Sequence, residues 1–177
     1  LSFYESGNKR EKVTFYNDYK VGLGYTYHPN GEIHEKTEYV RGDKYGLYQE
    51  YDSEKHLVVN GFYNRNVKID KWESFYDNGK LREFKFFKEG LLSGLRNKFF
   101  PNGEKSFEAK YVKDKEEGEF SMWFENGIKS ITGKFHNGMK NGTWYNFFKS
   151  GVKKEFVNYA QVSNEKDSIL SSWYEGS

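Results

Sequence analysis

Apolar positions in this chain recur with a fixed period of 24 residues. Two positions of the repeat hold an aromatic side chain in all seven copies. They are Phe3, Tyr27, Tyr51, Phe75, Phe99, Trp123 and Phe147, and Phe15, Tyr39, Tyr63, Phe87, Tyr111, Phe135 and Tyr159. Two such columns in one register do not arise by chance, so the chain is built from copies of one supersecondary unit.

Glycine marks two further positions of the repeat. The first glycine column precedes an aromatic cluster, and Asp70 fills its one gap. The second column follows nine residues later, and Lys55 interrupts it. The glycines are Gly22, Gly46, Gly94, Gly118 and Gly142 in the first column, and Gly7, Gly31, Gly79, Gly103, Gly127 and Gly151 in the second. Regular turn residues between aromatic runs indicate short strands.

Each copy predicts a β-hairpin. The first strand is an aromatic-rich run such as 118–124, and the second is a run such as 105–111 that ends on an invariant aromatic. Several copies place an Asn-Gly pair between them, for example Asn78-Gly79, and this dipeptide predicts a two-residue type I′ turn. A polar loop such as 112–117 is expected to lead to the next copy.

The hairpins are expected to stack, because one two-stranded ribbon is only marginally stable in water. The prediction is an all-β fold, an elongated single-layer antiparallel sheet of six to seven hairpin repeats over residues 1–159. Residues 160–177 leave the register. Segment 168–176 matches a first strand and predicts a degenerate repeat, while the alternative is a short capping helix with Ser163 as N-cap.

The clearest copies read GTWYNFF at 142–148 and DKWESFYDNG at 70–79. In this pattern the chain resembles the bacterial variant of the MORN-repeat family over residues 3–159. The resemblance implies an elongated sheet of β-hairpins. Similar proteins are exported repeat proteins or YwqK-type antitoxins that neutralise a partner toxin, and eukaryotic relatives are linked to membranes and scaffolding. Some lipid kinases carry such repeats, but nothing in this sequence resembles a kinase catalytic domain.

Composition excludes several classes of protein. The 15 Tyr, 16 Phe and 4 Trp explain how a chain of low mean hydropathy can still form a packed layer. No apolar run approaches the length of a membrane-spanning helix, and the absence of Cys excludes disulfides and thiolate chemistry. The 28 basic and 26 acidic residues give no basic arm, so we expect no nucleic-acid partner. Because the sequence starts at Leu1, an upstream segment is expected, and an exported or envelope location is favoured over a cytoplasmic one.

No residues suggest catalysis. His28, His34, His56 and His136 occupy four different positions of the repeat, whereas a repeated metal site would place them in one. His28 and His34 flank one turn and could approach each other across the hairpin. Gly22-Leu23-Gly24 lacks the rest of a phosphate loop. We therefore predict no catalytic residue, no metal ligand and no cofactor.

Two features suggest binding. Lys105, Lys129 and Lys153 share a column, which predicts a basic stripe along one edge that could contact an anionic lipid or an acidic protein. Tyr25, Tyr45 and Tyr145 lie outside the aromatic columns and are candidate interface anchors. The prediction is a non-enzymatic repeat protein that binds a protein, with a toxin as one candidate partner, or that self-associates. The alternatives are an exported scaffold of the cell envelope or surface and, more weakly, an anionic-lipid binder.

Overall fold

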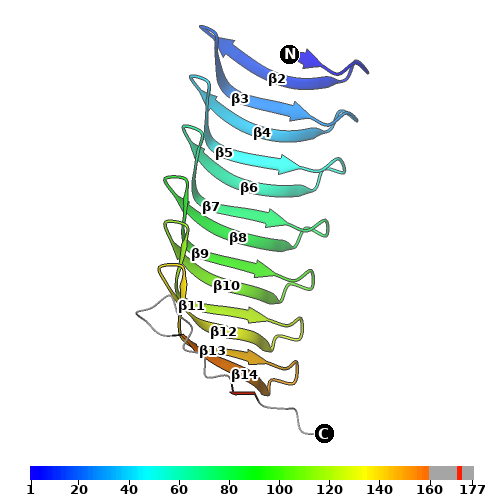
Figure 1. Ribbon diagram of the computed structural model, residues 1–177. Coiled ribbons are helices and arrows are strands. Elements are labelled where there is room, and N and C mark those ends of the chain that lie inside the picture. The colour runs from blue at the N-terminus through cyan, green and yellow to red at the C-terminus, as the bar shows by residue number, and fades with distance from the viewer. Residues whose placement is uncertain (160–170, 173–177) are drawn as a thin grey trace. The chain divides into compact units, whose positions relative to one another are not determined.

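The computed structural model describes residues 1–159 and 171–172, and all the regular elements among these residues are β-strands (Figure 1). The chain divides into two compact units, Leu1–Leu91 and Leu92–Ser177, which are described separately. The strands of unit 1 are β1 (Ser2–Phe3), β2 (Lys9–Tyr16), β3 (Tyr19–Tyr27), β4 (Ile33–Val40), β5 (Asp43–Tyr51), β6 (Leu57–Asn64), β7 (Val67–Phe75) and β8 (Leu81–Lys88). Those of unit 2 are β9 (Leu91–Phe99), β10 (Lys105–Val112), β11 (Lys115–Trp123), β12 (Lys129–His136), β13 (Met139–Phe147), β14 (Lys153–Tyr159) and β15 (Ser171–Ser172).

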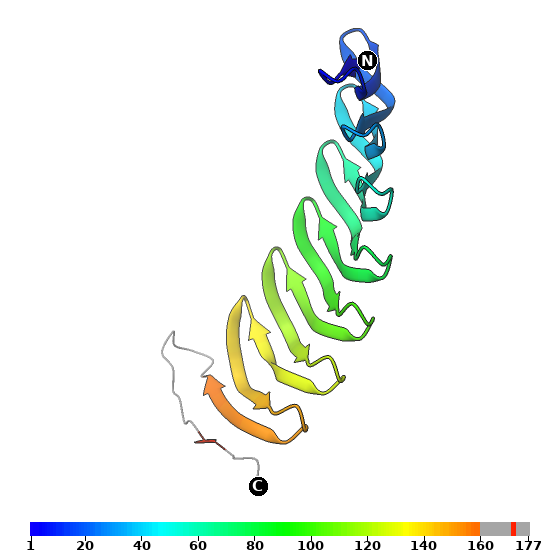
Figure 2. The same ribbon diagram turned by 90° about the vertical axis from the view of Figure 1, so that its right-hand side faces the viewer.

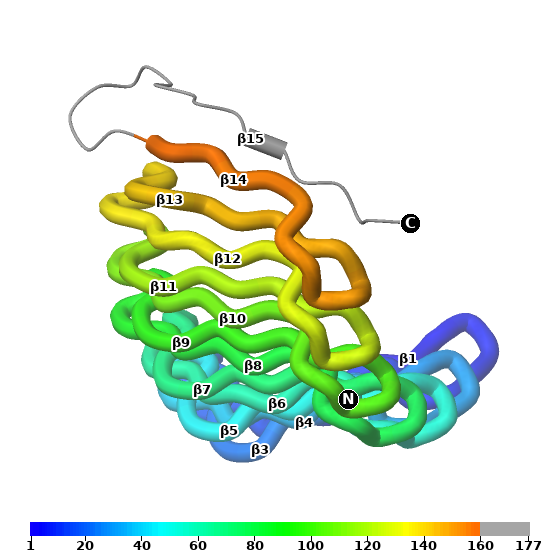
Figure 3. Tube along the Cα trace, turned by 90° about the horizontal axis from the view of Figure 1, so that it is seen from below, coloured from blue at the N-terminus to red at the C-terminus, as the bar shows by residue number. Residues whose placement is uncertain are grey.

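Strands that are consecutive in the chain are neighbours in the sheet. In unit 1, β1 to β8 pair successively, and every pair is antiparallel. In unit 2, β9 to β14 pair in the same way, and Figure 3 shows these strands side by side in one layer. The predicted all-β fold of antiparallel hairpins is confirmed.

Of residues 160–177, the structure describes only Ser171 and Ser172. They form β15, in which Ser171 pairs with Phe156 of β14. The remainder of the predicted degenerate repeat, and the alternative capping helix, lie outside the described residues. None of the described residues belongs to a helix that is long and apolar enough to cross a lipid bilayer.

The Asn-Gly turns differ from the prediction. Tyr76 donates its N–H to the Lys80 carbonyl at 2.9 Å and accepts from the Gly79 N–H at 2.8 Å. Gly79 has φ 75°, but Asn78 is not among the residues with positive φ. The loop is therefore a type I turn followed by a left-handed glycine, and the type I′ prediction is wrong. Asn78 serves as an acceptor, because its Oδ1 takes the N–H of Lys80 at 3.0 Å.

Type I′ turns occur instead at the connections between repeats. Lys113 (φ 49°) and Asp114 (φ 66°) fill the two left-handed positions, and Val112 pairs directly with Lys115. The prediction of a loop over 112–117 is wrong, since β10 ends at Val112 and β11 begins at Lys115. Asp114 Oδ1 accepts the N–H of Leu92 at 2.7 Å, and the Asp114 N–H donates to the Leu92 carbonyl at 2.9 Å. These bonds tie the turn to the strand two positions earlier.

The first glycine column lies in a two-residue β-bulge. In the pair β4–β5, Thr37 faces Tyr48 and Glu38 faces Tyr45, so β5 carries two additional residues between these pairs. Gly46 lies in this bulge with φ 73°, and Asp70 takes the corresponding position of β7 with φ 56°. Bulges bend the strand that carries them, and the bending of individual strands is visible in Figure 2.

One face of the sheet in each unit carries the buried rings, and we call it the core face. Trp72 is only 4% exposed, and its ring packs against Tyr48 and Tyr63 with centroid distances of 5.6 and 5.1 Å. It covers Gly61 of the neighbouring strand, where a Cβ would come within 2.3 Å of the indole. Trp144 covers Gly133 in the same way in unit 2. Rings that alternate with small residues therefore bury themselves within a single layer.

Candidate binding surface

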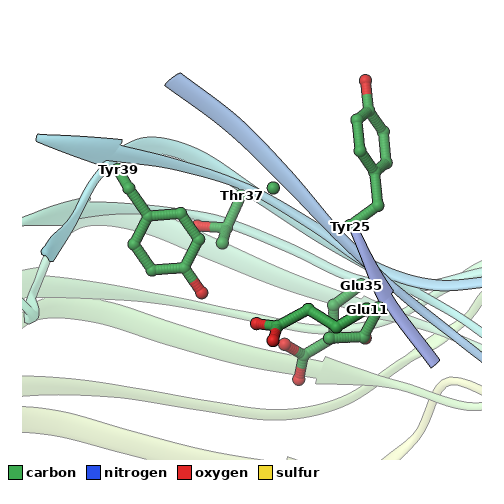
Figure 4. Close-up of a pocket in the computed structure, with 7 residues that line it drawn as sticks. Glu11, Tyr25, Glu35, Thr37 and Tyr39 are labelled. Atoms are coloured by element: carbon green, nitrogen blue, oxygen red, sulfur yellow. The ribbon is translucent and has the colours of Figure 1, made fainter. Parts of the chain in front are cut away.

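The three tyrosines singled out from the sequence all lie on the face away from the buried rings, which we call the opposite face of each unit. In unit 1, Figure 4 shows Tyr25 on one side of the ribbon and Glu35 and Tyr39 on the other. Tyr45 of the same unit is 45% exposed. In unit 2, Tyr145 pairs across strands with Phe156 and is half-buried. The Tyr145 ring contacts Phe147 and Phe156, with centroid distances of 6.3 and 6.2 Å.

Lys105, Lys129 and Lys153 lie in a row on the opposite face of unit 2. The sequence had predicted a row along an edge of the sheet instead. Each lysine is the cross-strand partner of an aromatic residue on the preceding strand. The pairs are Phe99 with Lys105, Trp123 with Lys129, and Phe147 with Lys153. We call these six residues the lysine–aromatic row. Since its lysines stand on every second strand, they are about 10 Å apart.

The lysine side chains of this row lie over aromatic rings. Lys105 Nζ is 5.4 Å and Lys129 Nζ is 5.9 Å from the Trp123 ring centroid, so this ring has an ammonium group on two sides. Lys153 Nζ is 4.6 Å from the Tyr145 centroid. Cation–π contacts of this kind contribute about 0.5–1 kcal/mol at exposed sites and hold the ammonium groups in place.

The charges of the row are unevenly compensated. Lys105 donates to Glu108 Oε2 at 2.6 Å, and this bond holds the pKa of the Glu108 carboxyl below its usual range. Glu108 also accepts from Asn97 at 3.2 Å. Among residues 1–159, no carboxylate lies within ion-pair distance of Lys129 or Lys153. Lys105 is therefore paired with Glu108 directly, whereas Lys129 acts on this carboxyl only through its charge, which also lowers the pKa of Glu108.

Sequence reasoning missed the ring members of this row. Phe99, Trp123 and Phe147 belong to an invariant aromatic column and were counted with the packed ladders. A lysine follows each of them after six residues, and this spacing was a signal that could have linked rings and lysines. Three of the corresponding pairs of unit 1 hold an aliphatic residue in place of lysine: Tyr27 with Ile33, Tyr51 with Leu57, and Phe75 with Leu81. The first pair of unit 1, Phe3 with Lys9, keeps the lysine.

The opposite face of unit 1 exposes several apolar side chains. Leu47 and Phe62 are direct cross-strand partners and are 37% and 39% exposed. Leu23 and Tyr45 are also exposed on this face. Exposed apolar groups of this size are typical of interaction surfaces. Unit 2 shares part of this apolar surface, because Leu95, at the repeat position of Leu23 and Leu47, is 46% exposed.

A shallow hollow lies on the core face of unit 1, between residues that include Glu11, Gly24, Thr37 and Tyr39 (Figure 4). The Tyr39 ring covers Gly24, where a Cβ would come within 2.6 Å of it. Burial raises the pKa of the Tyr39 hydroxyl, and the hydrogen bond to Glu11 raises the pKa of Lys20. The space between these side chains does not admit a water molecule, so the hollow is not a small-molecule site.

His28 and His34 do approach each other across their hairpin, with ring centroids 4.5 Å apart. His28 Nε2 lies 2.8 Å from the Tyr51 carbonyl oxygen, and His34 Nε2 lies 3.9 Å from Glu50 Oε1. His28 is thereby fixed by the backbone of the next repeat. In the part of the chain that the structure describes, no group of three or more His, Asp or Glu side chains is arranged to hold a metal ion.

Tyr48 lies between two carboxylates on the core face of unit 1. Its hydroxyl is 3.0 Å from Glu35 Oε1 and 3.2 Å from Glu50 Oε2. Burial raises the pKa of this hydroxyl strongly, and the charge of Glu35 raises it further. Tyr48 therefore stays protonated and acts as a donor within the packed layer.

Two segments, residues 20–41 and 71–89, match the family model described as MORN repeat variant. These segments contain most of the hairpin β3–β4 and most of β7–β8, and they support the resemblance to MORN repeats. No curated protein matches the chain. One solved structure, "Crystal structure of GtfA/B complex bound to UDP and GlcNAc", is 11% identical over 70% of this chain and 24% of that chain, with a TM-score of 0.29. A similarity this low supports no inference about function.

Proposed function

We propose that this chain is a non-enzymatic repeat protein that uses the opposite face of its sheets to bind another protein. The observation that carries the proposal is that Tyr25, Tyr45 and Tyr145 lie away from the buried rings of their units. This face carries tyrosines, exposed leucines and ring-stacked lysines, which offer anchors for an interface. MORN-type repeats place such side chains on a regular lattice.

The partner class is tested by affinity capture from the cells that express the protein. Wild-type protein should retain a specific partner, and the double variant Tyr45→Asp/Tyr145→Asp should lose it. Both substitutions place a charge on partly solvated positions, so the variant should still fold. Sedimentation of the purified chain distinguishes a second copy from a different partner. If the double variant captures the same proteins as wild type, the opposite face is not the interface.

A toxin is the most specific candidate partner, and the support for it is the resemblance to antitoxins of the MORN-variant type. Co-expression tests it, because a neutralising chain should restore growth of cells that produce the toxin encoded nearest to it. If no protein encoded by a neighbouring gene is toxic or binds this chain, the antitoxin form of the proposal is wrong. An exported scaffold of the cell envelope is the alternative, and it predicts that the mature protein fractionates with the envelope and has no soluble partner.

Contact with anionic lipid is a second candidate function, which Lys129 and Lys153 favour because neither forms an ion pair with a carboxylate among residues 1–159. Co-sedimentation with phosphatidylserine vesicles tests it. Lipid binding through this row predicts that the triple variant Lys105→Glu/Lys129→Glu/Lys153→Glu loses vesicle binding. Retention of binding by the triple variant would exclude the lysine–aromatic row as the lipid site.

A further inference from the structure

His28 and His34 form a pair that the packing of the repeat does not explain. His28 directly follows β3 and His34 lies in β4, and the turn between these strands brings their ring centroids to a distance of 4.5 Å. No other copy of the repeat holds a histidine at either position. The hairpin itself therefore does not require two imidazole rings at this place.

The Nε2 atom of His28 is held by the neighbouring hairpin. It lies 2.8 Å from the carbonyl oxygen of Tyr51, the last residue of β5. A carbonyl oxygen can only accept a hydrogen bond, so Nε2 of His28 donates its hydrogen in this contact. In a neutral imidazole, the other nitrogen, Nδ1, then carries the lone pair that can bind a metal ion.

His34 is oriented in a similar way by a carboxylate. Its Nε2 atom lies 3.9 Å from Glu50 Oε1, and the Tyr48 hydroxyl donates to the other carboxylate oxygen, Oε2, at 3.2 Å. The negative charge beside Nε2 favours the tautomer that has its hydrogen on this nitrogen, which again leaves the lone pair on Nδ1. Among residues 1–159, no hydrogen bond or ion pair engages the Nδ1 atom of either ring.

Histidines that bind metal ions have this arrangement, in which one ring nitrogen binds the ion and the other donates to a backbone carbonyl or a carboxylate. We propose that His28 and His34 together bind one divalent transition-metal ion through their Nδ1 atoms. Imidazole nitrogens bind such ions at about 2.0–2.1 Å, so two rings that share one ion must lie side by side, as these rings do. Cu²⁺ should bind most tightly, because nitrogen ligands follow the usual order of affinity for divalent metals.

The surroundings of the pair admit an ion. The side chains of His34 and Glu50 are 39% and 34% exposed, so a hydrated ion can reach the rings and keep water molecules as its other ligands. The Glu50 carboxylate offsets part of the charge of the ion without binding it directly. Two protein ligands are consistent with the finding that the described residues contain no cluster of three metal-binding side chains. The ion should therefore bind reversibly, and it should stabilise unit 1 by mass action.

The test is calorimetric titration of CuCl₂ into the full chain and its variants. His28→Gln and His34→Gln should each weaken Cu²⁺ binding at least tenfold, because each leaves a single imidazole at the site. His28→Gln keeps an N–H donor that can reach the Tyr51 carbonyl, so the fold should be retained, and circular dichroism checks this. The matched control is His136→Gln, which removes an exposed histidine that lies 3.0 Å from Glu117 in unit 2 and should not change the affinity. Electron paramagnetic resonance of the Cu²⁺ complex should show two imidazole nitrogens bound to the ion.

Loss of affinity in His28→Gln and His34→Gln that is no larger than in His136→Gln would overturn the proposal. A spectrum with one bound imidazole nitrogen would also overturn it, because the two rings would then not share the ion. Thermal unfolding gives an independent readout, since Cu²⁺ should raise the midpoint of wild type and not that of the double variant His28→Gln/His34→Gln. An equal rise in both proteins would show that the ion binds elsewhere. The protein-binding function proposed for the opposite face does not depend on any of these results.

Discussion

The Trp72 indole lies directly over Gly61, at a distance that leaves no space for a Cβ at position 61. This contact shows how one layer of strands buries a tryptophan. The ring lies on the backbone of the neighbouring strand, and Tyr48 and Tyr63 pack against it. The glycine in β6 and the ring in β7 are therefore one packing unit.

Gly61→Ala should destabilise the protein by about 1–3 kcal/mol, because the new methyl group displaces the Trp72 ring from its packed position. Chemical denaturation followed by tryptophan fluorescence measures this. Combining Gly61→Ala with Trp72→Leu should cost less than the sum of the single changes, because the clash is then removed. Additive losses would contradict the contact between the two residues.

Asp70→Gly should stabilise the protein by about 0.5–1 kcal/mol, because Asp70 holds φ 56° where the other repeats use glycine. The midpoint of thermal unfolding should rise. The matched control is Gly118→Asp, which places the same strain in the equivalent bulge of β11 and should lower the midpoint. A lower midpoint for Asp70→Gly would show that the Asp70 side chain makes a contribution that outweighs the backbone strain.

Acid should weaken the Lys105–Glu108 ion pair of unit 2. The pKa of Glu108 is lowered in the folded protein, chiefly by the hydrogen bond from Lys105. The pair therefore stabilises the fold fully above the unfolded carboxyl pKa of about 4.3, and this contribution is lost as the pH falls through the lower folded value. Carboxyl chemical shifts from NMR should report the lowered pKa, and Lys105→Met should move it upward. An unchanged Glu108 pKa in Lys105→Met would contradict the assignment.

Substitution of two tryptophans of unit 2 should have different effects, one on the free energy of unfolding and the other on partner binding. Trp144 is buried on the core face and covers Gly133, so Trp144→Ala should cost about 3–5 kcal/mol. Trp123 is half-buried on the opposite face, so Trp123→Ala should reduce stability much less and should weaken partner binding. Denaturation and affinity capture on the same two variants give the comparison. Equal losses of stability would mean that both faces contribute equally to the core.

The sequence predicted the repeat, the hairpins and the all-β class, because invariant aromatic columns such as that of Phe15 and Tyr39 record the packing directly. It did not predict the turns. Asn78-Gly79 is compatible with both a type I′ turn and a type I turn with a left-handed glycine, and the loop length decides between them. The strand boundaries at Val112 and Lys115 were misplaced as well, because the polar run 112–117 does not reveal that only Lys113 and Asp114 form the turn.

The faces could not be assigned from the sequence because bulges interrupt the strict alternation of side chains. In the pair β9–β10, Lys98 faces Phe107 and Phe99 faces Lys105, so one extra residue shifts the register between them. A period of two continued through that bulge assigns Lys105 to the wrong side. The shared column of Lys105, Lys129 and Lys153 predicted a basic stripe along an edge, whereas in unit 2 these lysines pair with rings on the opposite face.

Site-specific photo-crosslinking in cells that express the protein tests the central claim most directly. A benzophenone amino acid replaces Tyr45 or Tyr145 on the opposite face, and Glu11, which lines the hollow on the core face, serves as the control position. We predict adducts with a protein partner from Tyr45 and Tyr145 and none from Glu11. Adducts from Glu11 alone, or none from any position in cells where the protein is functional, would contradict the account.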